Sequence, residues 1–213
     1  MMSRLLFEKT GESIYISHLD LMRVFQRAFR RAGLLLRHSQ GFTPRAIVSI
    51  ALPLALGTES RCELLDFELQ EAGTVTPEQL NAVLPAGIRV LEVYETGRKL
   101  KELVYLRVQV ELEYDQGAPS AEAVDAVFRQ ESIMVEKQSK KGSTQVDIRP
   151  MIRKLSVDRP DGHTIVLDAE ITAQQPSLNP MLLSQAVETA LGKADFVHCR
   201  RLEVLDGQGE VFR

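Results

Sequence analysis

The order in which hydrophobic patterns follow one another most constrains the fold, because the same order occurs twice. In the first half, residue periodicity predicts strand, helix, strand, strand, helix and strand over residues 4–16, 17–33, 34–52, 63–70, 76–84 and 88–96. We expect a turn or bend at 11–13 within the first strand, and a loop or bulge at 40–44 that interrupts the strand between 34–39 and 45–52. After a polar stretch at 97–102, the order repeats over 103–114, 120–130, 134–157, 164–173, 178–191 and 195–206. The segment 134–157 fits least well, since DIRPMIRKL suits a short helix as readily as a strand.

Two copies of a split βαβ unit predict an α+β protein with two tandem ferredoxin-like domains. Each domain should be an antiparallel sheet with two helices on one face. We expect the domains to span residues 1–97 and 103–213, joined by the polar stretch between them.

The helix expected at 17–33 has strong signals at both ends. Ser17 followed by Asp20 is a capping-box pattern, and Gly33 suits the left-handed residue that commonly ends a helix. Its apolar side holds Leu21, Phe25, Ala28 and Ala32, with Met22 and Phe29 at the margin. Its opposite side holds Arg23, Arg27, Arg30 and Arg31.

This arginine side has two interpretations. Any amphipathic helix turns polar residues to water, so a solvated face is the simpler one. However, no acid follows Asp20 on this face, and like charges repel by a few tenths of a kcal/mol per pair. Arginine binds phosphate bidentately and stacks on bases, so the face also suits a polyanion.

The charge of the chain is distributed unevenly. The net charge of the whole sequence is −3, yet residues 17–50 hold six arginines against one acid. Arg37 and Arg45 complete this set and bracket the turn GFTP, which could enlarge the patch. A basic region on an otherwise acidic chain can attract a polyanion without making the whole surface bind anions non-specifically.

The loop SQGFTPR at 39–45 supplies further candidate contacts. These are Ser39, Gln40, Gly41, Phe42 and Pro44, to which we add His18 at the start of the helix. Gly41 permits a positive φ, and Pro44 stiffens the exit of the loop. For Phe42 we favour core packing over an exposed platform for stacking bases.

A second basic stretch lies in the other half of the chain, and we expect it to be a solvated loop. Its residues are Lys137, Lys140, Lys141, Arg149, Arg153 and Lys154.

Several classes of function find no support in the sequence. Cys62 and Cys199 are far apart without a metal-ligand spacing, so buried thiols are expected and no metal site. Ser17, His18 and Asp20 point in different directions at a helix start, which argues against a catalytic triad. No apolar run approaches the roughly 18 residues of a membrane span, so we expect a cytoplasmic protein without a membrane partner.

The run YISHLDLMRVFQRAFRRAGL, followed by SQGFTPR and ALPLALGTES, resembles the radical SAM-linked uncharacterised protein family. Family members usually read GFNPHPK where this chain has GFTPRAI. The resemblance implies an accessory protein whose partner is a radical SAM enzyme. It also implies that S-adenosylmethionine, an iron–sulfur cluster and cobalamin belong to that partner, with no cofactor bound by this chain.

We therefore predict a non-catalytic binding module that presents RNA, such as tRNA or rRNA, to a radical SAM enzyme. The RNA-binding residues would be the six arginines at 23, 27, 30, 31, 37 and 45. One alternative is a protein-interaction domain whose arginine face docks on an acidic surface of the radical SAM partner. Another is an enzyme that uses His18, Ser39 and the GFTP loop on a small anionic substrate.

Overall fold

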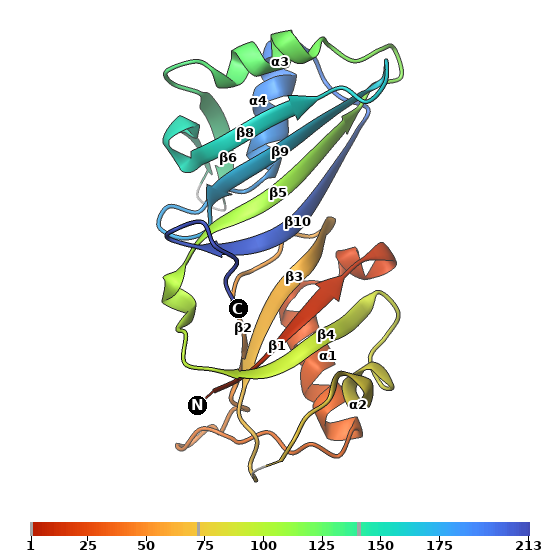
Figure 1. Cartoon of the computed structure of the whole chain (residues 1–213), viewed down its shortest axis with the longest axis vertical. Coiled ribbons are helices and arrows are strands. Elements are labelled where there is room, and N and C mark those ends of the chain that lie inside the picture. Colours follow the sequence, from red (N-terminus) through yellow and green to blue (C-terminus); the bar gives the residue numbers. More distant parts are fainter. Residues whose placement is uncertain (1, 72, 140–141) are drawn as a thin grey trace. The chain divides into compact units, whose positions relative to one another are not determined.

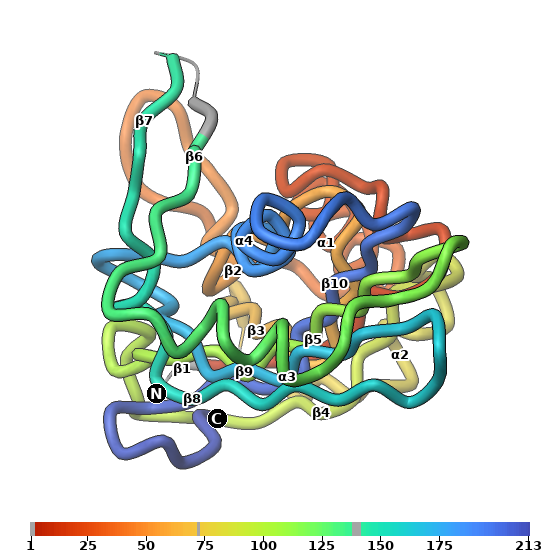
Figure 2. Tube along the Cα trace, turned by 90° about the horizontal axis from the view of Figure 1, so that it is seen from above, coloured from red at the N-terminus to blue at the C-terminus, as the bar shows by residue number. Residues whose placement is uncertain are grey.

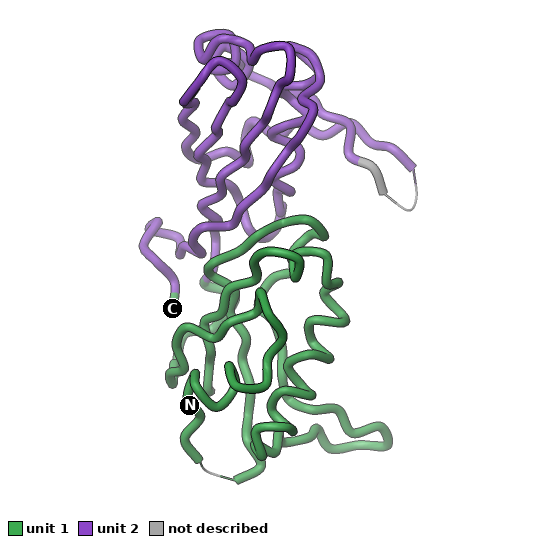
Figure 3. Tube along the Cα trace, turned by 90° about the vertical axis from the view of Figure 1, so that its right-hand side faces the viewer, with its two compact units in different colours: residues 1–102, 213 green, residues 103–212 purple. Residues whose placement is uncertain are grey.

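The computed structural model describes residues 2–71, 73–139 and 142–213, in which helices and antiparallel strands are mixed (Figure 1). The chain divides into two compact units, coloured separately in Figure 3. Unit 1 comprises residues 1–102 with Arg213, and unit 2 comprises residues 103–212. No helix within the described ranges is both long and apolar enough to cross a membrane.

Unit 1 contains one sheet with the strand order β4-β1-β3-β2, in which all neighbours are antiparallel. Its elements are β1 (Met2–Lys9), the 3-10 helix η1 (Gly11–Tyr15), α1 (His18–Arg31), β2 (Val48–Ile50), β3 (Thr58–Phe67), α2 (Pro77–Asn81), β4 (Ile88–Thr96) and the 3-10 helix η2 (Leu100–Glu102).

Alternation along the strands of unit 1 places one side-chain face against both helices. Leu5 and Phe7 of β1 and Leu65 of β3 share a buried cluster with Phe25 of α1 and Leu80 of α2. A residue two positions along a strand returns to the same face, so this period of two builds the core. The helices α1 and α2 therefore cover the same face of the sheet (Figure 1).

Unit 2 repeats this arrangement with one insertion. Its elements are β5 (Leu103–Glu113), α3 (Ala121–Phe128), β6 (Met134–Ser139), β7 (Gly142–Asp147), the 3-10 helix η3 (Arg149–Met151), β8 (Ile152–Asp158), β9 (Thr164–Thr172), α4 (Met181–Leu191) and β10 (Phe196–Asp206). The sheet order is β10-β5-β9-β8, again antiparallel throughout. The strands β6 and β7 form a separate hairpin that extends from the rest of the unit (Figure 2).

The sequence prediction was accurate for some elements and wrong for others. The strand predicted at 88–96 has those bounds in β4, and the helix predicted at 17–33 is α1. The strand predicted at 4–16 turns at 11–13 as expected, but it does not resume there: β1 ends at Lys9, Gly11 takes a positive φ and the chain continues as η1. Buried Lys9 fixes this turn, since its Nζ donates to the carbonyls of Ile14 and Ile16.

Segment 134–157, which fitted the pattern least, holds more structure than a single strand. It contains the inserted hairpin, then η3, and then most of β8. DIRPMIRKL thus includes both a 3-10 turn and the start of a strand. Both cysteines are buried, as predicted, and burial raises the pKa of the Cys199 thiol to about 12.

Gly87 joins η1 to the start of β4 in a way that no other residue type can. Its φ is +81°, and an added Cβ would meet the carbonyl oxygen of Thr10 and lie 2.9 Å from the Ser13 Cβ. Its own carbonyl accepts hydrogen bonds from the Thr10 amide at 2.7 Å and the Ser13 hydroxyl at 2.8 Å. The close approach therefore holds two segments together, 74 positions apart at Ser13.

Gly87→Ala should lower the free energy of unfolding of the protein by more than Gly57→Ala. Gly57 has nearly the same φ, +78°, but an added Cβ there meets nothing within 4 Å. Gly57→Ala should cost about 1–2 kcal/mol of left-handed strain, whereas Gly87→Ala adds a backbone clash and two weakened hydrogen bonds. Urea unfolding of both variants measures the difference. Equal destabilisation would show that the close approach contributes nothing.

Candidate functional site

The start of α1 is fixed by its own residues. The Ser17 hydroxyl oxygen accepts a hydrogen bond from the Asp20 amide at 3.2 Å and donates one to the Asp20 carboxylate at 2.7 Å. Asp20 also pairs with Arg23 at 2.8 Å. These bonds, first that of Ser17 and then that of Arg23, hold the pKa of the exposed Asp20 carboxyl below its usual range.

The end of α1 leads directly into a long hairpin-like loop. Gly33 has φ +76°, and the Leu34 amide donates to the Phe29 carbonyl at 2.9 Å, which closes the helix. The following segment then pairs with the end of β3. Its bonds join the Arg37 amide to the Glu68 carbonyl and the Gln70 amide to the Leu35 carbonyl, each at 2.8 Å.

The tip of this loop, residues 39–45, is closed at its neck by Ser39 and Arg45. The Ser39 amide donates to the Arg45 carbonyl at 2.8 Å, and the Ser39 hydroxyl accepts from the Arg45 amide at 3.1 Å. The loop projects from unit 1, as its orange segment in Figure 1 and its green hairpin in Figure 3 show. Gly41 takes φ +131° at the tip, as its position in the turn predicted.

Core packing was the wrong expectation for Phe42. Its side chain is fully exposed at 110%, because the loop that carries it points away from the core of unit 1. The neighbouring loop residues Gln40, Gly41 and Pro44 are exposed as well. Phe42 therefore has the exposed position that a stacking platform requires.

The six arginines of the predicted surface differ in their partners. Arg23 pairs with Asp20, and Arg37 pairs with Glu68 at 2.9 Å, so these two charges are balanced within unit 1. Arg31 donates to the Val83 carbonyl at 3.2 Å, which leaves its charge unbalanced. Arg27, Arg30 and Arg45 are exposed and have no ion pair or side-chain hydrogen bond among the described residues.

A pocket of about 540 Å³ lies beside two of these guanidinium groups. From α1 it is lined by Gln26, Arg27 and Arg30, because Gln26 and Arg27 each lie about one turn before Arg30. The loop and the end of β3 complete the lining with Leu34, Leu35, Leu36, His38, Ala46 and Gln70. A second, smaller hollow of about 320 Å³ adjoins Arg27 and Arg31. Arg27 thus borders both.

The pocket includes residues that sequence reasoning missed. Gln26 could have been found, since it lies one turn before Arg30 on the same helix face. Leu35, His38 and Gln70 carry no such signal, because the pairing of the loop with the end of β3 brings them together. Neither His18 nor Ser39 lines this pocket. His18 is eight residues before Gln26, about 12 Å along the helix.

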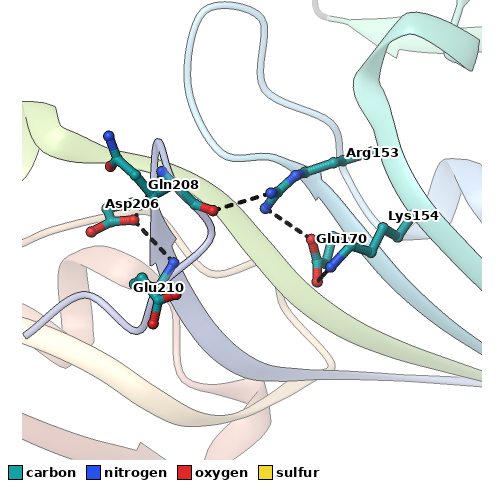
Figure 4. Close-up of polar contacts among 6 residues, drawn as sticks. All are labelled: Arg153, Lys154, Glu170, Asp206, Gln208 and Glu210. Carbon is teal, nitrogen blue, oxygen red and sulfur yellow. Dashed lines mark hydrogen bonds and ion pairs between the residues drawn. The ribbon is translucent and has the colours of Figure 1, made fainter.

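The second basic stretch differs, because much of its described charge is balanced within unit 2. Glu170 accepts from Arg153 at 3.1 Å and from Lys154 at 3.0 Å (Figure 4). Arg153 also donates to the Gln208 carbonyl at 3.2 Å, and its guanidinium lies 4.9 Å from the centre of the Tyr105 ring. Lys140 and Lys141 lie outside the described residues.

The described residues also hold no cluster of three or more His, Cys, Asp or Glu side chains that could bind a metal ion. The surface around Arg27 and Arg30 therefore offers positive charge, hydrogen-bonding amides and an apolar wall as its chemistry. Such a combination suits an anionic ligand that has a flat or apolar part.

Comparison with known proteins gives a family and a fold. The model of the family "uncharacterized protein conserved in bacteria (DUF2344)" matches residues 3–180. That description does not mention a radical SAM partner, which stays a prediction. No curated protein matches the chain.

Among the solved structures that the chain resembles, three are similar at low sequence identity. A chain in the crystal structure of a Cbf5–Nop10–Gar1 complex matches at 10% identity, with a TM-score of 0.55, over 95% of this chain and 48% of its own length. A chain of the archaeal box H/ACA sRNP Nop10–Cbf5 complex matches at 10% identity, with a TM-score of 0.50, over 93% of this chain and 46% of its own length. A chain of the H/ACA RNP bound to a substrate RNA containing 2′-deoxyuridine matches at 8% identity, with a TM-score of 0.52, over 98% of this chain and 48% of its own length.

These similarities are of fold alone. The chain spans about half the length of the solved chains that it matches.

Ser17→Ala should raise the pKa of Asp20 toward the value of about 3.9 typical of an isolated Asp side chain. The Ser17 hydroxyl bond is the largest cause of the lowered pKa, so Arg23→Ala should raise it less. A lowered folded-state pKa stabilises the fold above about pH 3.9, and this stabilisation is lost as pH falls through the folded-state value. Carboxyl-carbon NMR titration of the wild type and of the two variants measures the Asp20 pKa in each. An unchanged Asp20 pKa in Ser17→Ala would contradict the assignment.

Proposed function

Because the chain belongs to the family of uncharacterized proteins conserved in bacteria (DUF2344), whose description assigns no activity, we propose a function from the site itself. The protein is a non-catalytic module that binds RNA through the arginine surface of unit 1 and presents it to a radical SAM enzyme. By arginine surface we mean Arg27, Arg30, Arg31 and Arg45, with Arg23 and Arg37 at its edge.

The observation that carries this proposal is the state of Arg27 and Arg30. Both side chains are exposed and line a pocket, and neither forms an ion pair or a side-chain hydrogen bond among the described residues. Two like charges one helix turn apart repel each other, so an anion placed between them is favourable. A phosphate group can accept two hydrogen bonds from one guanidinium, which makes it a suitable anion.

The loop enlarges this surface. It carries the unpaired charge of Arg45 and the fully exposed ring of Phe42, on which a base can stack. The ion pairs of Arg23 and Arg37 leave these side chains about 60% exposed, and exposed pairs contribute only about 0–1 kcal/mol. Both arginines can therefore exchange their carboxylate for a phosphate at little cost.

The fold supports a nucleic-acid partner in a general way. The order fourth, first, third, second in each sheet, leaving out the inserted hairpin, is that of a ferredoxin-like domain, and we propose two such domains in tandem. Three of the solved structures that the chain resembles are Cbf5 or H/ACA complexes, one of them bound to a substrate RNA. RNA is therefore a reasonable ligand for a chain of this fold.

The radical SAM partner is supported by the sequence resemblance alone. In this proposal the partner holds the iron–sulfur cluster, S-adenosylmethionine and cobalamin. This chain would contribute the RNA-binding surface and no reacting group.

Arg27→Glu with Arg30→Glu should weaken binding of single-stranded RNA by at least roughly tenfold at about 100 mM salt, because phosphate contacts dominate such binding. Fluorescence anisotropy with a labelled RNA measures the affinity. The matched control is Arg61→Glu with Arg89→Glu, which makes the same change in net charge at exposed positions of β3 and β4. An equal loss in the control would indicate a general charge effect and refute a specific surface.

The same variants test the partner. The wild-type chain should co-purify with its proposed radical SAM partner after nuclease treatment. If Arg27→Glu with Arg30→Glu abolishes this co-purification while RNA affinity is unchanged, the arginine surface is a protein-docking surface and the RNA proposal fails. If co-purification never occurs, the radical SAM partner is excluded.

A further inference from the structure

We infer that the pocket beside Arg27 and Arg30 holds a single unstacked base of the bound RNA, with the phosphate of that nucleotide on the two arginines. This inference rests on the proposed function and deepens it, because it assigns a base-binding site to a surface otherwise proposed only for phosphates. A volume of about 540 Å³ lies within the range of about 300–1,000 Å³ typical of pockets for small molecules.

The two sides of the pocket differ in chemistry. The loop provides an apolar wall of consecutive leucines, of which Leu36 is buried and Leu35 remains 62% exposed. The helix provides the positively charged side chains of Arg27 and Arg30. A nucleotide likewise combines an apolar part with a charged part, because its base presents flat apolar faces and its phosphate is an anion. Enzymes and binding proteins that take a base out of a stack hold its faces against aromatic or apolar side chains.

Groups that could bond to the edge of a base also line the pocket. Gln26 lines the pocket from α1 and Gln70 from the segment after β3, and both are exposed. Neither side-chain amide makes a hydrogen bond to another described residue. A carboxamide offers both a donor and an acceptor, which is the combination that the edges of unpaired RNA bases require.

His38 adds a third group with a defined direction. Its Nδ1 lies 3.0 Å from the Leu36 carbonyl oxygen, which can only accept a hydrogen bond. Nδ1 must therefore carry the proton, and in the neutral ring Nε2 is an acceptor. Nε2 can accept a hydrogen bond from a base N–H or from the ribose 2′-hydroxyl.

The expected ligand is RNA in a single-stranded state, because a base inside a duplex cannot enter a pocket. A small free anion would use the arginines but would leave the leucine wall and both amides without partners. An unmodified protein segment carries no phosphate group to place between the two arginines. The combination of all three features thus favours a nucleotide.

The test compares two labelled oligomers of about 12 units, oligouridylate and an abasic phosphate chain with the same number of charges. Wild-type protein should bind oligouridylate at least roughly tenfold more tightly than the abasic chain. In Gln26→Ala with Gln70→Ala this preference should fall several-fold. The slope of log affinity against log salt should not change, because no charge is removed.

The matched control is Phe42→Ala, which removes a base contact outside the pocket. In the wild type, the side-chain amide NMR signals of Gln26 and Gln70 should shift when oligouridylate is added and should not shift with the abasic chain. Phe42→Ala should show the same response. If the double glutamine variant keeps the full preference and those signals do not move, the base pocket is refuted while the arginine surface stands. If neither oligomer binds at about 50 mM salt, the proposed function itself fails.

Discussion

The packing of α1 on the sheet of unit 1 is the interaction on which the candidate site depends. Phe25 meets Phe7 of β1 edge to face, with 4.6 Å between ring centroids, and Phe29 meets Phe67 of β3 at 4.8 Å. Truncation of such buried rings typically costs about 3–5 kcal/mol, so the helix cannot rotate freely about its axis. Because the apolar side is fixed inward, Arg27 and Arg30 must face solvent.

A second constraint builds the other wall of the site. The segment after Gly33 pairs with the chain beyond β3, through backbone bonds at Arg37 and at Gln70. This pairing lies next to the arginine side of α1 and places Leu35 and Gln70 in one pocket with Arg30. Helix and loop are joined by only a few residues, so a single unit forms the whole pocket.

The two basic regions of the chain differ in how many of their charges are paired with acids. In unit 2, Glu170 balances Arg153 and Lys154, and this network resembles an ordinary stabilised sheet face. In unit 1, acids balance only two of the six arginines. Of the other four arginines, only Arg31 makes a side-chain hydrogen bond among the described residues, to the Val83 carbonyl, and none of the four forms an ion pair there. A function in ligand binding accounts for their presence better than stability does.

The sequence by itself determined the features that depend on near neighbours. Ser17 and Gly33 set the ends of α1, the helical period separated its arginines from its phenylalanines, and alternation gave β4 its bounds. Tertiary structure alone decided the exposure of Phe42, the turn after Lys9, the pairing of Arg37 with Glu68 and the inclusion of Gln70 in the pocket. The physical reason is distance along the chain. Capping and periodicity act within a few residues, whereas a pocket forms where segments more than 30 positions apart meet, as Leu35 and Gln70 do.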